Sequence, residues 1–132
     1  MAPPARHSLE QILRIARLTS SRGEGLSLLD AIDRAGYASL RSGFRPADLV
    51  PVLRAQPSLV QDWLLFSADK RTSGGWYVTE EPHVVGSIDA AVEVEFGSIE
   101  EAVAEFVVRE LDQAVALRES GRGSDRPRPG EH

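Results

Sequence analysis

The spacing of apolar residues predicts helices in the first part of the chain. Apolar side chains recur at helical intervals over residues 9–19, and Ser8 is the expected N-cap of this helix. A second helix is expected over residues 26–35, where Gly36 would end it. The chain therefore begins as a helical protein.

The pattern becomes ambiguous in the middle of the chain. Pro46 is expected to open a third helix, and Pro51 should make that helix start late, kink or stop early. Four consecutive apolar residues, 63–66, are buried on both faces if they form a strand. Residues 59–66 therefore fit either a helix or a strand, and we favour a helical turn over residues 57–61 followed by a strand over about residues 62–68.

The next segments predict a small antiparallel sheet. Residues 75–79 are rich in aromatic and β-branched side chains, and they are expected to pair with the preceding strand through a hairpin loop at residues 69–74. Further strands are expected at residues 84–88 and 91–96. The last strand alternates strictly, with its valines and phenylalanine facing inward and its glutamates outward.

The C-terminal helix has the clearest start signal. Ser98 and Glu101 form a capping box, and apolar residues then recur at helical spacing to about Leu117. A single α+β domain is therefore predicted over residues 8–118, with N-terminal helices, an antiparallel sheet of three to four strands and a C-terminal amphipathic helix packed on the sheet. Residues 1–7 are expected to be flexible and residues 119–132 to form a disordered tail.

The charge is unevenly distributed. The net charge is −5, and residues 79–112 carry ten acidic side chains against the single Arg109. This field repels nucleic acid and attracts a basic protein, although solvated faces of a strand and a helix would explain the same acids. With no cysteine and no long apolar segment, the chain is expected to be cytoplasmic and to bind no membrane.

Candidate catalytic and metal-binding residues are few. The three histidines at positions 7, 83 and 132 share no ligand spacing, so no metal or other cofactor is expected. His83 has the chemistry of a general base, but a loop histidine of this kind is more often an ordinary surface residue. Glu93 and Glu95 lie on one sheet face and could hold a cation, although an exposed strand explains them more simply. We therefore predict no catalytic residue and no enzyme.

Residues 67–77 are unusual because the only lysine of the chain lies there, in a polar turn that is followed by two aromatic residues. The cations of this turn could pair with the downstream acids and act as an internal clamp. Alternatively, its aromatic and charged side chains could anchor a protein interface. The candidate partner-binding residues are Asp69, Lys70, Arg71, Trp76, Tyr77, Glu93 and Glu95.

The segment SADKRTSGGWY at residues 67–77, followed by FGS at 96–98 and EAVAEF at 101–106, resembles small bacterial proteins of poorly defined function. Some of these are similar to immunity proteins that are encoded beside toxins. The resemblance covers roughly residues 57–115 and implies a noncatalytic inhibitor that neutralises a basic toxin. It supplies no catalytic residues.

Two other functions remain open at this point. A small enzyme or ligand-binding domain could use the loop at residues 69–77 together with His83. A regulatory adaptor could instead associate with itself. The expected state is accordingly either a monomer or a homodimer.

Overall fold

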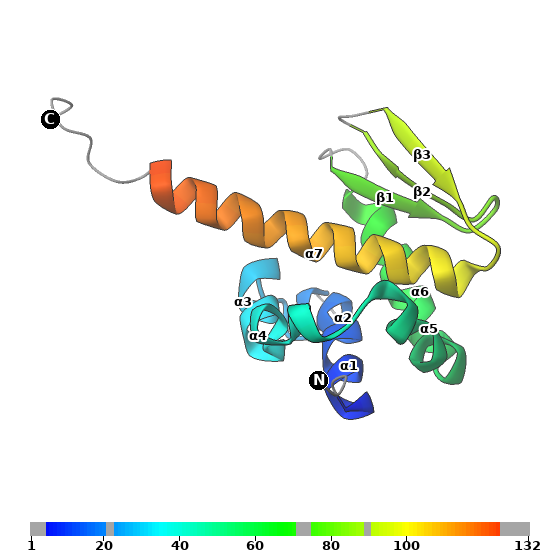
Figure 1. The fold of residues 1–132 in the computed structure, drawn as a ribbon, viewed down its shortest axis with the longest axis horizontal. Coiled ribbons are helices and arrows are strands. Elements are labelled where there is room, and N and C mark those ends of the chain that lie inside the picture. Colours follow the sequence, from blue (N-terminus) through cyan, green and yellow to red (C-terminus); the bar gives the residue numbers. More distant parts are fainter. Residues whose placement is uncertain (1–4, 21–22, 71–74, 89–90, 125–132) are drawn as a thin grey trace, which may run out of the picture.

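The computed structural model in Figure 1 describes residues 5–20, 23–70, 75–88 and 91–124. They form three layers. A three-stranded antiparallel sheet lies on one side, the long helix α7 crosses the middle, and α1 to α5 pack on the other side of α7. The predicted α+β class is therefore confirmed, including the C-terminal helix that packs on the sheet.

The N-terminal helices follow the predicted pattern with one break. The expected helix at residues 9–19 is divided into α1 (Arg6–Leu13) and α2 (Ile15–Thr19), and α1 is preceded by Ala5 rather than capped by Ser8. Its start at Arg6 places part of the expected flexible N-terminus in a helix. The second helix, α3 (Leu28–Ala35), ends as predicted at Gly36, whose φ of 70° is left-handed.

Two short elements after Gly36 were not predicted from the sequence. They are α4 (Tyr37–Leu40) and the 3-10 helix η1 (Arg41–Gly43). Helix α5 (Pro46–Ala55) then opens at the predicted proline and continues through Pro51. It is one of the main contacts of α7.

The predicted strand from Asp62 is wrong, because residues 57–70 form one continuous helix, α6 (Pro57–Lys70). The apolar run fits a helix since only part of it needs burial: Trp63 is fully buried, whereas Leu65 is 62% exposed. Trp63 packs edge to face against Phe66, with ring centroids 5.2 Å apart. The strand that was expected to lead into the hairpin is therefore replaced by a helix, and residues 71–74 of the expected loop lie outside the described residues.

The other predicted strands are confirmed, so the sheet has three strands. They are β1 (Trp76–Thr79), β2 (Val84–Ser87) and β3 (Val92–Glu95), hydrogen-bonded in the order β1-β2-β3. Val78 and Val85 lie opposite each other on the inner face and join the core. The alternation expected in β3 is present, but both of its valines remain 45% exposed.

Helix α7 (Ile99–Ser124) starts where predicted, with the Ser98 Oγ accepting a hydrogen bond from the Glu101 N–H over 3.2 Å. It ends later than predicted, so residues 119–124 are helical rather than part of a tail. Residues 125–132, where the rest of that tail was expected, lie outside the described residues. The buried part of α7 contains Ala102, Val103, Ala104, Phe106, Val107, Val108 and Leu111.

One edge of the sheet is closed by a serine of α6. Ser67 is 1% exposed, and its Oγ accepts a hydrogen bond from the Val78 N–H at 2.9 Å and donates one to the Val78 carbonyl at 3.2 Å. These backbone groups of β1 face away from β2. At Val78, this hydroxyl therefore takes the place of a further strand.

Replacing this serine tests the role of the hydroxyl. Ser67→Ala should lower the free energy of unfolding by about 1 to 3 kcal/mol, because it leaves a buried N–H and carbonyl without partners. Chemical denaturation would measure the change. The matched control is Gln61→Ala, an exposed position on the same helix, which should change stability by less than about 0.5 kcal/mol. Equal stabilities of the two variants would contradict this role.

Candidate functional site

Three residues form a row across the outer face of the sheet. The strand register places Tyr77 opposite Gly86, and Gly86 opposite Glu93. The Tyr77 hydroxyl donates a hydrogen bond to the Glu93 Oε2 at 2.7 Å, so the tyrosine ring spans from β1 to β3. A Cβ atom on Gly86 would lie 2.5 Å from the Tyr77 Cζ. Glycine is therefore needed where the ring crosses the middle strand.

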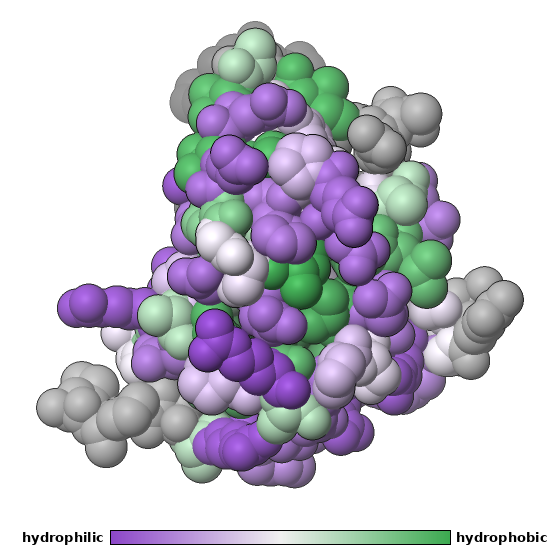
Figure 2. Space-filling model, turned by 90° about the vertical axis from the view of Figure 1, so that its right-hand side faces the viewer, coloured by the Kyte–Doolittle hydropathy of each residue, from purple (hydrophilic) through white to green (hydrophobic). Residues whose placement is uncertain are grey.

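The same face carries a second carboxylate and an open hollow. Glu95 is exposed two residues beyond Glu93 on the same strand, so both side chains point outward. A hollow of about 530 Å³ is lined by Tyr77, Ser87, Ile88, Ala91 and Glu93. We call Tyr77, Glu93 and Glu95 the acidic face. The sheet lies at the top of Figure 2, and hydrophobic and hydrophilic residues lie side by side on its visible surface.

Trp76 lies on the opposite face of the sheet from Tyr77. Its half-buried ring packs against the core, and the guanidinium of Arg109 in α7 lies 4.8 Å from the ring centroid. Arg109 also pairs with Glu105. Trp76 and Tyr77 therefore contribute to opposite faces of the sheet. The cation beside Trp76 comes from α7.

The predicted polar turn is only partly described. Asp69 is exposed in the last turn of α6 and lies outside the acidic face. The side chain of Lys70 and all of Arg71 lie outside the described residues, so both the internal clamp and the interface anchor stay predictions for this turn. Of the seven predicted partner-binding residues, the structure brings Tyr77, Glu93 and Glu95 together.

His83 lies just before β2, where its carbonyl accepts a hydrogen bond from the Phe96 N–H at 2.8 Å. Its ring Nδ1 is buried, and no hydrogen bond links it to another described residue. Within residues 5–20, 23–70, 75–88 and 91–124, no three histidine, cysteine or acidic side chains converge on a point that could hold a metal ion.

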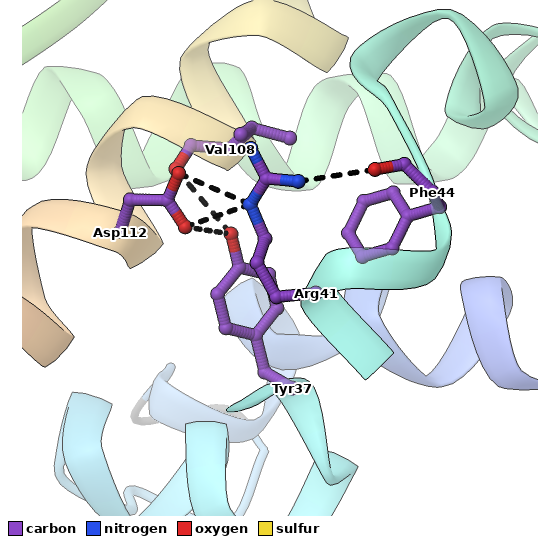
Figure 3. A network of polar contacts seen from close by, with 5 residues as sticks. All are labelled: Tyr37, Arg41, Phe44, Val108 and Asp112. Carbon is purple, nitrogen blue, oxygen red and sulfur yellow. Dashed lines mark hydrogen bonds and ion pairs between the residues drawn. The ribbon is translucent and has the colours of Figure 1, made fainter. Parts of the chain in front are cut away.

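A polar network that sequence reasoning missed joins η1 and α4 to α7 (Figure 3). The Tyr37 hydroxyl donates to the Asp112 Oδ1 at 2.6 Å, and the Arg41 Nε donates to both oxygens of that carboxylate at 2.9 and 3.1 Å. Arg41 also donates to the Phe44 carbonyl at 3.0 Å. Tyr37 and Arg41 are more than 70 positions from Asp112 in the sequence, and no local pattern predicts their contact with it.

This network is a structural anchor. Tyr37 is 1% exposed, and burial, followed by the hydrogen bond and charge of Asp112, raises the pKa of its hydroxyl well above the ordinary value. The hydrogen bond to Asp112 likewise raises the pKa of Arg41. Both oxygens of Asp112 are already engaged, so the carboxylate is held in place between two helical elements.

Comparison of the chain with protein-family models, curated proteins and solved structures found no significant match. The resemblance to immunity-type proteins therefore stays a prediction. Among the helices of the described residues, none combines the length and the apolar character needed to cross a membrane.

The anchor predicts a specific pH dependence. Because the pKa of Tyr37 is higher in the folded protein than in the unfolded chain, its contribution to stability is complete below about pH 10 and is lost as the pH rises further. The chain has two tyrosines, so Tyr77→Phe leaves Tyr37 as the only one. Phenolate absorbance of this variant should rise only together with unfolding. Phenolate formation near pH 10 in a folded protein would contradict the burial of this hydroxyl.

The row across the sheet predicts the effect of a single methyl group. Gly86→Ala should push the Tyr77 ring away from Glu93 and lower the free energy of unfolding by about 1 to 3 kcal/mol. Gly97→Ala is the matched control, because its nearest neighbour is the flexible end of the Glu101 side chain at 3.3 Å. Thermal unfolding would compare the two. If both substitutions cost the same, the tight packing of Tyr77 over β2 is wrong.

Proposed function

We propose that this protein is a noncatalytic protein-binding module that holds a basic partner protein against its acidic face. The observation that carries the proposal is the pair of outward carboxylates, Glu93 and Glu95, beside the Tyr77 ring on one exposed strand. Tyrosine supplies contact area at low entropic cost, and carboxylates pair well with arginine or lysine.

The row geometry supports this function because it orders part of the face before a partner arrives. The Tyr77 hydroxyl engages one carboxylate oxygen of Glu93 and restricts the orientation of that side chain, and no hydrogen bond joins the other oxygen to a described residue. A group already ordered in the free protein loses less conformational entropy on binding. The contact therefore favours recognition at this position.

Nearby charges extend the field of the acidic face. The register places Thr79, Val84 and Glu95 in one row, so the exposed Glu80 and Glu81 follow at the same end of the sheet. Like charges gathered at one end raise the rate at which a basic partner arrives and disfavour acidic competitors.

The resemblance of residues 57–115 supports a narrower form of the proposal, an immunity or inhibitor protein that neutralises a toxin encoded nearby. A toxin that cleaves or binds nucleic acid has a basic surface, which such an acidic face would cover. A cytoplasmic location is part of this proposal.

Charge neutralisation tests the proposal. The products of the adjacent genes should be purified and titrated with this protein by calorimetry at low and at physiological salt. For the partner found, Glu95→Gln should weaken binding by about tenfold and reduce its dependence on salt. Glu119→Gln is the matched control, because it removes the same charge from an exposed position far along α7.

Two results would contradict the proposal. One is that no adjacent gene product binds the folded protein. The other is that Glu95→Gln and Glu119→Gln weaken binding equally, since only the total charge would then matter.

A further inference from the structure

We infer that the partner binds by adding an extended basic strand to the free edge of β3, antiparallel to it. This inference rests on the proposed function and specifies how the acidic face is used.

The sheet has two edges, and they differ. The outward backbone groups of Val78 in β1 are engaged by Ser67, so a further strand cannot pair with that residue. At the other edge, the Phe96 N–H bonds to the His83 carbonyl. Because backbone groups alternate along an antiparallel ladder, those of Val94 then face β2, whereas those of Glu93 and Glu95 face away from it.

Within the part of the chain that the structure describes, the outward backbone groups of β3 have no partner. Every residue of β3 is exposed, and no hydrogen bond joins the backbone of Glu93 or Glu95 to another described residue across this edge. An edge with free N–H and carbonyl groups is a template for a further strand. This mode of recognition obtains affinity from the backbone and specificity from alternate side chains.

The side chains of β3 specify an alternating partner. Its inner face has Val92 and Val94, each 45% exposed, and Val94 continues the row of the core residues Val78 and Val85. Its outer face has Glu93 and Glu95. A strand that alternates apolar residues with lysine or arginine would cover the valines on one face and pair with the carboxylates on the other.

A second copy of this chain is a poor occupant of the edge. In a two-fold dimer that joins two β3 strands antiparallel, the outer faces become continuous, so the glutamates of one copy lie opposite those of the other. Like charges directly opposite each other destabilise a strand pair. The charge pattern therefore selects a basic partner.

The test uses the full chain and three short peptides of alternating lysine and valine. One peptide is unmodified, one is N-methylated at every lysine, and one is N-methylated at every valine. In the antiparallel pairing, the lysines lie opposite Glu93 and Glu95, and their N–H groups face β3. Methylation of the lysines should therefore weaken binding by about tenfold or more, whereas methylation of the valines should leave it nearly unchanged.

Hydrogen exchange gives an independent measurement at the edge itself. The unmodified peptide should slow exchange of the Glu93 and Glu95 amides by about tenfold or more, while the Val94 amide, which already faces β2, should change little. Glu95→Pro should abolish binding because it removes one of these amides, and Glu95→Gln should only weaken binding because it keeps the amide. Circular dichroism would establish that both variants are folded.

The outcomes separate this inference from the proposed function. Equal binding of the two methylated peptides, or binding without amide protection, would overturn strand addition and leave a charge-based interface intact. No binding of the unmodified peptide at low salt would also overturn strand addition. Protection of the Glu93 and Glu95 amides in a peptide-free dimer would show that a second copy occupies the edge and would overturn the basic occupant.

Discussion

The fold depends on the burial of α7 from two opposite sides. The inner face of the sheet packs on one side of this helix, and α5 with α3 packs on the other. Seven residues between Ala102 and Leu111 are apolar and buried. A helix that is covered on two opposite sides belongs to the centre of a domain, even though Glu105 and Arg109 keep contact with solvent. Neither the sheet nor the N-terminal helices would have a complete core without it.

Buried polar groups connect the layers that apolar contacts bring together. The Trp63 indole N–H donates to the Leu13 carbonyl at 2.8 Å and joins α6 to α1. Asp112 accepts hydrogen bonds from Tyr37 and Arg41 and thereby joins α7 to α4 and η1. Apolar burial has little directional preference, whereas each of these contacts requires one relative placement of its helices. They help to select one packing among several that would bury similar area.

The sequence predicted elements whose signals are local. Ser98 with Glu101 marks the start of α7, Gly36 marks the end of α3, and alternation marks β3. It misassigned residues 62–68 because a short apolar run has no clear period, and only the finished packing decides that Leu65 stays exposed. Periodicity carries too little information to separate a helix from a strand over so few residues.

In the candidate site, too, the local features could be predicted from the sequence and the long-range contacts could not. Alternation alone predicted that Glu93 and Glu95 point outward. The contact between Tyr77 and Glu93 depends on the register of three strands and on a glycine between them, neither of which can be read from the separate segments. The pairing of Trp76 with Arg109 depends on where α7 crosses the sheet. Each of these contacts joins segments that are distant along the chain.

The hydrogen bonds of Ser67 also limit how far the sheet can grow. A sheet with two free edges can recruit strand after strand and lead to fibres. Here one edge ends at a side chain, so whatever joins at β3 cannot be followed by a second addition at β1. The molecule can act as the end of a sheet but not as a link within one.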